Sequence, residues 1–390
     1  MTKGTIYLDN AATTWPKPEE VYRAVDMAMR EHGANPGRGA YRMSVDAQRV
    51  VDETRQEVCR LFNAPAPERV IFTMNCTDAL NLALKGLIKS GDRVVTGPYE
   101  HNSVTRPLYS LHRAGAQVAV MKPTKTFGID LDHFGELGRD RLDYVVVSHV
   151  SNVTGGVSPV KEISKITHER GGLLILDAAQ SAGDLDIDIQ DLGVDVLAAP
   201  GHKGLYGPMG TGMLVLSAPL AVKPFREGGT GFKSESPEQP EEYPWRLEAG
   251  TLNLPGIAGL AAGVRFVRSL GVNAIAEHEA SLARRLADGL RQIDRVSVFC
   301  EPVPRTGVVS FRLAAADVAL TGTILDESFG IAVRTGLHCA PAAHHAIGTF
   351  PKGTVRVSFG QFNTSGDVDA LIAAVRQISN THAADRPVRA

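Results

Sequence analysis

The middle of the chain alternates short apolar runs with segments of helical periodicity. Between residues 69 and 217, seven runs rich in β-branched residues are typical of strands: RVIFTM, RVVTGP, QVAVMK, YVVVSHV, LLILDAA, VDVLAA and GMLVLS. Between the first two runs, Leu80, Ala83, Leu84 and Leu87 recur at helical spacing, which predicts an amphipathic helix. Strands that alternate with helices predict a mainly parallel sheet covered by helices on both faces.

The last of these runs differs from the others in its connection. GMLVLS follows VDVLAA with no room for a crossover helix, so we expect it to enter the sheet antiparallel. The pattern therefore predicts an α/β fold with a mainly parallel seven-stranded sheet flanked by helices.

The pattern changes after the stretch LEAGTLNLPG. Long helical patterns at about 256–270 and 273–293 precede three short apolar runs and a closing helix from about Asp367. We therefore predict two domains. The large cofactor-binding α/β domain covers 16–255, and a smaller α+β domain combines 1–15 with 256–390.

Composition and charge narrow the function. The 390 residues include 43% hydrophobic residues and carry a formal net charge of −2, which suits a large core and gives no electrostatic footprint for nucleic acid. The N-terminus lacks the apolar core of a signal peptide, and no run is long enough to span a bilayer. The four cysteines have neither metal-ligand nor disulfide-framework spacing: Cys59, Cys76, Cys300 and Cys339. We expect a cytoplasmic protein with reduced thiols that binds no metal, membrane or nucleic acid.

Polar residues collect where the predicted strands end. His101, Asn152 and Asp177 each follow one apolar run, Gln180 lies three residues further, and Lys203 follows the sixth run in a loop of glycines and prolines. In an open α/β sheet, ligands bind outside the carboxyl ends of the strands. A lone residue of this kind is often only a helix cap or a solvated turn residue, but so many at successive strand ends favour a shared site.

The first strand end predicts a phosphate seat. Asn75, Cys76 and Thr77 lie between that strand and the following helix, where backbone amides and a hydroxyl can bind an anion. Taken alone, the same residues also fit an ordinary N-cap.

These groups together suit the chemistry of pyridoxal phosphate. A lysine forms an imine with the cofactor's aldehyde, and a carboxylate keeps the ring nitrogen protonated so that the ring accepts electrons. Lys203 is the lysine. We assign Asp177 to the ring nitrogen and either Asn152 or Gln180 to the ring oxygen. His101 is assigned to the ring face and Thr77 to the phosphate.

The sequence resembles the cysteine desulfurases, in the class V aminotransferase branch of the fold-type I pyridoxal phosphate-dependent transferases. The resemblance runs nearly end to end through YLDNAATT, NPGRGAYRMS, EHNSV, SHVSNVTGG, LDAAQS, GHKGLYGP, EAGTLN, RTGLHCAP and VRVSFGQFNT. It implies pyridoxal 5'-phosphate as cofactor, L-cysteine as substrate and a homodimer. It also implies a sulfurtransferase that forms a persulfide and passes it to a sulfur-acceptor protein, within sulfur metabolism such as iron–sulfur cluster assembly.

The resemblance implies roles around the cofactor ring. Lys203 would be the Schiff-base lysine, and Asp177 would hold the pyridinium nitrogen. Gln180 and Asn152 would contact the ring hydroxyl. His101 would stack on the ring and move a proton near the substrate sulfur.

It also implies a phosphate site shared between subunits. Cys76 through its amide, Thr77 and His202 would bind the phosphate, and Thr251 would reach the phosphate of the other subunit. Many relatives carry Ser or Thr where this chain has Pro200, so one phosphate contact should be missing.

On the substrate side, Arg356 and Asn152 would bind the amino acid, with Arg356 on its carboxylate. Cys339 would be the sulfur-accepting nucleophile, since the neighbouring His338 and Arg334 are cationic or polar groups that favour a thiolate. The short RTGLHCA loop resembles the second desulfurase type, in which the cysteine is held near the cofactor.

Two cysteines and two histidines take plainer roles. Cys59, in an amphipathic helix, and Cys300, at the end of a strand, are expected to be inert. His344 and His345 lie in a segment that departs from typical desulfurases, and we expect both at the surface.

Three alternatives remain open at this point. A selenocysteine lyase uses the same fold and a cysteine in the same place. A transaminase or another C–S lyase would leave Cys339 a bystander. A cofactor-binding scaffold without turnover would need none of this set of reactive residues.

Overall fold

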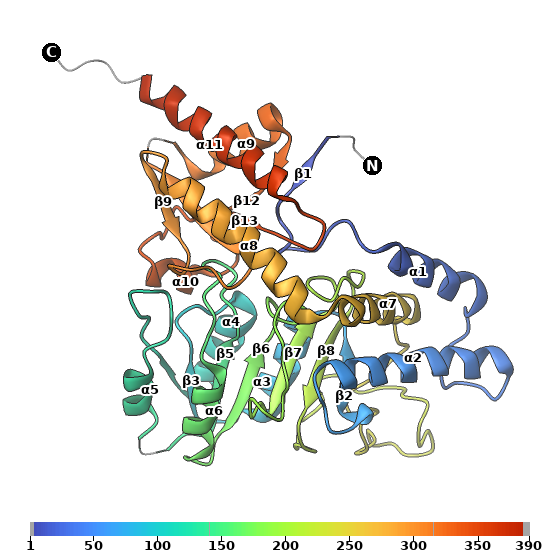
Figure 1. Ribbon diagram of the computed structural model, residues 1–390. Coiled ribbons are helices and arrows are strands. Elements are labelled where there is room, and N and C mark those ends of the chain that lie inside the picture. Colours follow the sequence, from blue (N-terminus) through green and yellow to red (C-terminus); the bar gives the residue numbers. More distant parts are fainter. Residues whose placement is uncertain (1–3, 140, 315, 385–390) are drawn as a thin grey trace.

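The computed structural model describes residues 4–139, 141–314 and 316–384 (Figure 1). A seven-stranded sheet of order β2-β8-β7-β6-β5-β3-β4 forms the centre of its larger part. Its strands are β2 (Val70–Thr73), β3 (Arg93–Thr96), β4 (Gln117–Val120), β5 (Tyr144–Ser148), β6 (Leu173–Asp177), β7 (Val196–Pro200) and β8 (Gly212–Leu216). All seven predicted runs are therefore confirmed as strands.

Strand direction follows the expected pattern. Neighbouring strands from β4 through β3, β5 and β6 to β7 are parallel, whereas β8 is antiparallel to both β7 and β2. The short connection before β8 leaves no length for a crossover, and the predicted antiparallel entry is confirmed.

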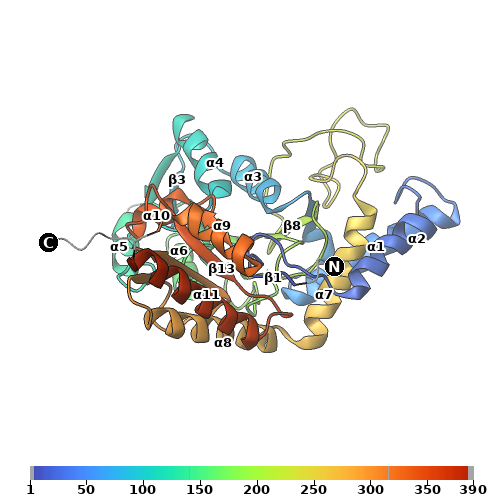
Figure 2. The ribbon, with the colours of Figure 1, turned by 90° about the horizontal axis from the view of Figure 1, so that it is seen from above.

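Helices cover both faces of this sheet, as Figure 2 shows for α3 (Cys76–Leu87) and α4 (Asn102–Arg113) on one side and α6 (Val160–His168) on the other. Leu174 and Leu176 of β6 pack in the core that includes α6, while Ile175 packs in the core under α3 and α4. Successive side chains of a strand point to opposite faces, so continuous apolar runs need cover on both.

A smaller four-stranded antiparallel sheet, of order β12-β13-β10-β9, lies above the first in Figure 1. Its strands are β9 (Val296–Phe299), β10 (Val308–Leu313), β12 (Arg334–Gly336) and β13 (Thr354–Ser358). It packs with α8 (Val272–Arg291), α9 (Val318–Phe329) and α11 (Ser365–Ala384). The three predicted strands and the closing helix are confirmed, and α9 and β12 are additions.

The N-terminal segment joins this smaller part. β1 (Ile6–Tyr7) pairs in parallel with β11 (Ile331–Ala332), and Asp9 forms an isolated bridge with Ser358. The first residues of the chain therefore run along the small sheet before they reach the large one.

The helix α7 (Leu254–Leu270) lies at the expected domain boundary. Its buried Leu254, Ile257, Leu260 and Val264 belong to the core of the large sheet. The expected division after residue 255 therefore falls inside α7. Residues 1–3, 140, 315 and 385–390 of the expected domains lie outside the described residues.

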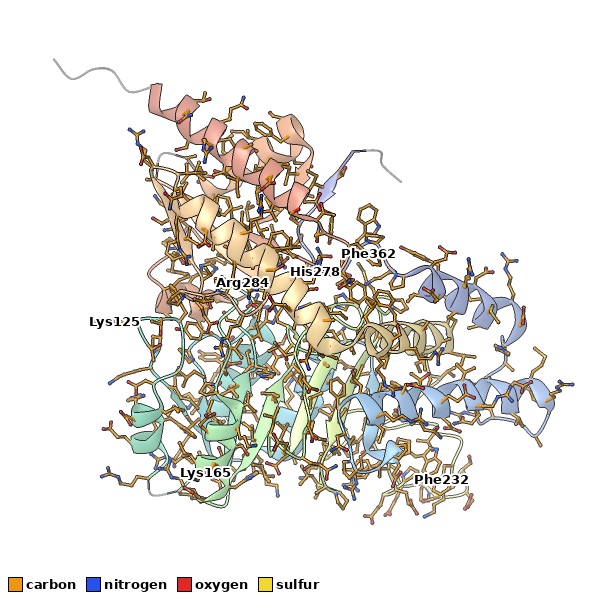
Figure 3. The ribbon with its side chains drawn as sticks, viewed as in Figure 1. Lys125, Lys165, Phe232, His278, Arg284 and Phe362 are labelled. Atoms are coloured by element: carbon orange, nitrogen blue, oxygen red, sulfur yellow. The ribbon has the colours of Figure 1, made fainter. Side chains whose placement is uncertain are left out.

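An aromatic contact joins the two parts. Tyr206, which follows β7, meets Phe266 of α7 and Phe362, which follows β13, with ring centroids 5.4 and 6.0 Å away. Figure 3 labels Phe362 beside His278 of α8, whose Nε2 lies 3.0 Å from the Asn363 carbonyl oxygen. The small sheet is thus packed directly against the part that carries Lys203.

The remaining elements complete the chain. They are α1 (Glu19–Glu31), α2 (Arg42–Leu61), the 3₁₀ turn η1 (Pro67–Arg69), α5 (Leu131–Leu137) and α10 (Pro341–Ala346). Among the described residues, no helix combines the length and apolar character needed to cross a membrane.

Candidate active site

A cavity opens at the carboxyl ends of β2, β5, β6 and β7. Eight of the residues singled out from the sequence line it: Cys76, Thr77, His101, Asn152, Asp177, Gln180, His202 and Lys203. Parallel strands bring their carboxyl ends to one edge, so residues far apart in sequence meet there.

The loop that carries Lys203 is held by the N-terminal segment. The His202 carbonyl oxygen accepts hydrogen bonds from Thr13 Oγ1 at 3.0 Å, from the Thr14 backbone N–H at 3.2 Å and from Lys17 Nζ at 2.8 Å. The Lys203 carbonyl oxygen accepts one from Thr14 Oγ1 at 3.0 Å. These bonds fix the backbone on which the Lys203 amine stands.

The surroundings of Lys203 make its amine easier to deprotonate. Burial lowers the pKa of the Lys203 amine, and the Arg356 guanidinium lowers it further. A neutral amine can act as a nucleophile or a base. Gly204 follows at once, where a Cβ would lie only 2.4 Å from Asp184 Oδ1 and 2.5 Å from the Ala182 carbonyl oxygen. Only glycine fits there.

Asp177 ends β6 with its carboxylate at the cavity. Its Oδ1 accepts the Ala179 backbone N–H at 2.9 Å and lies 3.5 Å from Cys76 Sγ, and no side chain or amide of the described residues donates to Oδ2. Burial raises the pKa of the Asp177 carboxyl, against the lowering effect of the Ala179 N–H and Lys203. A cationic ring nitrogen would restore the charged form.

The candidate phosphate seat lies at the start of α3. Asn75 is the N-cap and accepts the Asp78 backbone N–H at 2.9 Å, so the N-cap role and a binding role coexist. Thr77 is exposed, and the buried His202 Nδ1 has no hydrogen-bond partner among the described residues. Pro200 also lines the cavity and offers no N–H.

Hydrogen bonds fix the tautomer of His101. Its Nδ1 accepts the Ser103 backbone N–H at 3.0 Å and lies 2.8 Å from Ser103 Oγ, which is 2.7 Å from Thr77 Oγ1. A neutral ring that accepts at Nδ1 carries its hydrogen on Nε2. Burial, assisted by Lys203 and Arg334, lowers the pKa of His101 to about 4. The imidazole is therefore neutral at pH 7 with Nε2 as a donor.

Cys339 is exposed on a loop pinned at two carbonyl groups. The Cys339 carbonyl oxygen accepts the Asn102 backbone N–H, and the His338 carbonyl oxygen accepts Asn152 Nδ2, both at 2.8 Å. His338 and Cys339 both have left-handed backbone, with φ of 50° and 57°. Arg334 Nη2 lies 3.3 Å from Cys339 Sγ. The loop that carries the thiol is therefore hydrogen-bonded to Asn152, which lines the cavity, and the thiol itself lies beside a cation.

Arg356 is buried beside this loop on β13. Its Nη2 donates to Asp9 Oδ1 at 2.7 Å, its Nη1 donates to the Asn152 carbonyl oxygen at 3.1 Å, and its Nε has no partner among the described residues. Arg334 of β12 stands opposite Arg356 in the strand pairing. Two guanidinium groups thus lie near Cys339.

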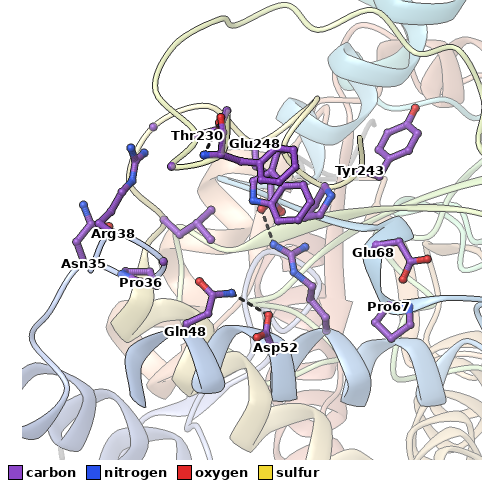
Figure 4. A pocket seen from close by; sticks show the side chains of 18 of the residues that line it. Asn35, Pro36, Arg38, Gln48, Asp52, Pro67, Glu68, Thr230, Tyr243 and Glu248 are labelled. Atoms are coloured by element: carbon purple, nitrogen blue, oxygen red, sulfur yellow. Dashed lines mark hydrogen bonds and ion pairs between the residues drawn. The ribbon is translucent and has the colours of Figure 1, made fainter. Parts of the chain in front are cut away.

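Thr251 does not join this cavity. It is exposed, and Asn35 Nδ2 donates to its Oγ1 at 3.3 Å. The residues beside it, Gly250 and Leu252, line a separate cavity of about 630 Å³ between α2 and the 230–252 segment (Figure 4). The buried ion pair of Arg55 with Glu248 lies there, and none of the strand-end residues does.

The prediction of two surface histidines is half wrong. His344 is fully buried in α10, and its Nδ1 lies 2.6 Å from Thr349 Oγ1. His345 is exposed and stacks on Phe350. The His344 ring lies 5.5 Å from the ring of His338, and a helix of six residues is too short for its periodicity to indicate which side is buried. Cys300 is buried, which raises the pKa of its thiol to about 11 and fits the inert role expected for it.

Fold and site together define a class-V aminotransferase: the family model described as Aminotransferase class-V matches residues 6–371. A probable cysteine desulfurase of Methanothermobacter thermautotrophicus is 36% identical over 380 residues, which cover 96% of this chain and 94% of that protein. A cysteine desulfurase of Enterobacter sp. (strain 638) is 34% identical over 95% of this chain and 93% of that protein.

Solved structures agree. The apo cysteine desulfurase of Thermococcus onnurineus NA1 superposes with a TM-score of 0.91 at 33% identity, covering 97% of this chain and 95% of that one. The Escherichia coli cysteine desulfurase CsdA, as its S-sulfonic acid form, superposes with a TM-score of 0.88 at 28% identity. The match covers 98% of this chain and 96% of that one. The chain belongs to the cysteine desulfurase family, whose enzymes use pyridoxal 5'-phosphate.

Sequence reasoning missed four polar groups at the site. Three of them are Asp9, Lys17 and Ser103, which lie in or next to the quoted motifs. Asp9 and Lys17 contact residues distant in sequence, Arg356 and His202, and the contact of Ser103 with His101 depends on side-chain rotamers. The fourth is the Cys76 thiol, which lies 3.5 Å from Asp177 Oδ1, whereas the resemblance assigns a role only to the Cys76 amide. Only the position of Asp9 just after an apolar run gave a usable signal.

Proposed function

We propose that this chain is a pyridoxal phosphate-dependent cysteine desulfurase that converts L-cysteine to L-alanine and retains the sulfur as a persulfide on Cys339. The observation that carries the proposal is the exposed Cys339 thiol, which lies 3.3 Å from Arg334 on a loop hydrogen-bonded to Asn152 of the cavity that contains Lys203. A bystander cysteine would need neither the fixed loop nor the cation.

The residues at the cavity suit the cofactor. Lys203 supplies the amine for the aldehyde, and the free oxygen of Asp177 suits the ring nitrogen. Asn152, Gln180 and His101 line the same cavity, which supports the ring hydroxyl as the contact of the first two and the ring face as that of His101. When bound, the cofactor withdraws electrons from the substrate's Cα.

The phosphate donors form a second group. The start of α3 at Cys76, the Thr77 hydroxyl and the unpartnered Nδ1 of His202 are candidates. Thr251 of a second subunit is proposed to complete them.

The chain's own groups account for the proton and sulfur steps. Arg356 binds the substrate carboxylate, and the freed Lys203 amine takes the Cα proton. The Cys339 thiolate attacks the substrate sulfur, so that an S–S bond forms while the substrate C–S bond breaks. The proton that Lys203 removed returns to Cα and the proton of the substrate thiol passes to Cβ, so the products are L-alanine and the Cys339 persulfide. His101, with hydrogen on Nε2, serves as a donor near the sulfur.

Replacement of Cys339 tests the activity. We expect Cys339→Ser to retain cofactor absorbance but to release no L-alanine from L-cysteine above background. Tryptic mass spectrometry of the wild-type enzyme after incubation with L-cysteine should show one added sulfur on Cys339, and the matched Cys59→Ser variant should behave as wild type.

Other outcomes would contradict the proposal. An added sulfur on Cys59, Cys76 or Cys300 instead would refute the role of Cys339. Conversion of the cofactor to its pyridoxamine form would identify a transaminase, and turnover confined to L-selenocysteine would identify a selenocysteine lyase.

We further propose a homodimer. Large exposed apolar side chains concentrate on and beside α1 and α2, at Trp15, Tyr22, Met27, Met29, Tyr41, Met43 and Val45. A second copy is a fitting cover for such a surface. A sulfur-acceptor protein, a cytoplasmic location and the division into 16–255 and 1–15 with 256–390 stay predictions of the sequence.

A further inference from the structure

Arg356 already contacts a carboxylate that belongs to the chain. We propose that Asp9 competes with the substrate carboxylate for Arg356 and thereby weakens the affinity of the site for amino-acid carboxylates. The identity of the substrate in this inference rests on the proposed function. The contact between Asp9 and Arg356 does not depend on that function.

The Arg356 guanidinium is only partly satisfied. It is fully buried, and its described partners are Asp9 Oδ1 at 2.7 Å and the Asn152 carbonyl oxygen at 3.1 Å. Its Nε–H has no partner among the described residues. A carboxylate bound through two parallel hydrogen bonds needs two adjacent N–H groups of a guanidinium. Nε–H and Nη2 form one such pair in Arg356, so a carboxylate that binds there would need the Nη2 that Asp9 contacts.

Asp9 is held in place by its backbone. The Leu8 carbonyl oxygen accepts the Ser358 backbone N–H at 2.8 Å, and the Ala11 N–H donates to Ser358 Oγ at 2.8 Å. Asn10 Nδ2 donates to the Ser358 carbonyl oxygen at 3.0 Å. Because both neighbours are tied to β13, Asp9 can leave Arg356 only by side-chain rotation. Its side chain is 22% exposed, which gives that rotation room.

The surrounding charges make two carboxylates unfavourable there. A buried guanidinium needs a counterion, and Asp9 supplies it in the free enzyme. The Tyr7 hydroxyl stays neutral, since burial and Asp9 raise its pKa to about 12. Arg334 and Lys203 are further basic groups near Arg356, and Arg334 contacts Cys339. An incoming carboxylate must therefore displace Asp9 or lie beside its charge, and either cost reduces affinity.

The variant Asp9→Asn tests the competition, because it keeps an oxygen for Arg356 and removes the charge. The probe is propionate, a carboxylate without an amine or a thiol. Calorimetry on the holoenzyme should show propionate binding about tenfold more tightly to Asp9→Asn than to wild type. The KM for L-cysteine should fall in the same direction, while turnover of cysteamine, which lacks the carboxylate, should keep its KM.

Two controls separate this effect from a structural one. Asp9→Glu keeps the charge and should keep the wild-type affinity. Asp191→Asn removes an exposed carboxylate that pairs with Lys161 at 2.7 Å, and should change nothing. If Asp9→Asn is unstable, propionate should raise its Tm more than it raises that of wild type.

Unchanged or weaker propionate binding by Asp9→Asn would overturn the proposal and make Asp9 a group that orients Arg356. Propionate binding needs no sulfur chemistry. Failure of the proposed function would appear separately, as a wild-type enzyme that releases no L-alanine from L-cysteine.

Discussion

The His101 imidazole is kept neutral by its burial and by the cations around it, which lower its pKa to about 4. The unfolded chain takes up this proton near pH 6.5, so the folded state loses stability relative to the unfolded state as the pH falls from 6.5 toward 4. Above pH 6.5 both states are neutral at this residue, and the loss is absent.

This linkage predicts the behaviour of His101→Gln, whose side chain does not titrate. Between pH 7.5 and 5, urea unfolding should show wild type losing up to about 2 kcal/mol more unfolding free energy than the variant. Parallel losses in the two proteins would mean that His101 titrates alike in the folded and unfolded states.

Individual site residues were predictable where the sheet alone gathers them. Asp177, Asn152 and Lys203 follow apolar runs, and the geometry of parallel strands brings such positions together. Asp9 could not be assigned in this way, because its contact with Arg356 joins opposite ends of the chain through the small sheet. The buried state of His344 depended equally on packing that no local pattern records.

At the level of elements, strong periodicity was sufficient for the large sheet and for α3, α7 and α8. The short elements β11, β12 and α10 carry too few residues for a period, and their positions follow from pairing with β1 and β13 and from the turn at Cys339. The helix α9 lies in an apolar stretch with a weak pattern, and Asp317 as its N-cap was the available signal.

The N-cap of α3 should serve both folding and cofactor binding. Asn75→Ala removes the acceptor for the Asp78 N–H and should cost about 1 kcal/mol of unfolding free energy. Because α3 begins at the candidate phosphate seat, the variant should also lose cofactor faster on dialysis, as followed by absorbance.

A matched variant isolates the binding effect. Asp317 is the N-cap of α9, a helix of the same length as α3, and its carboxylate accepts the Ala319 N–H at 2.8 Å. The variant Asp317→Ala removes this cap. It should cost similar stability and leave cofactor retention unchanged. Equal retention in both variants would argue that α3 does not bind the phosphate.

At the scale of the whole molecule, Thr251 lies outside the cavity of its own chain, as a residue that serves a second subunit would. In a two-fold dimer, each subunit would complete the other's site. Thr251→Ala should then weaken cofactor retention without unfolding the chain, and the Tm of the cofactor-free protein should stay unchanged. The missing donor at Pro200 makes the remaining phosphate contacts more important.

Mixing two inactive chains tests the sharing. When Lys203→Ala and a Thr251 variant exchange subunits, each mixed dimer contains one site with both groups and one with neither, so activity should return to part of the wild-type level. A fully active monomer in sedimentation at assay concentration would disprove the shared site.

The left-handed backbone of His338 and Cys339 has a consequence for engineering. Each non-glycine residue in that conformation costs about 1–2 kcal/mol, whereas glycine adopts it freely. Thermal stability therefore favours glycine at these two positions, whereas sulfur transfer requires the cysteine. A variant library sorted by thermal endurance alone would favour glycine at 338 and 339, and would discard the thiol along with the strain.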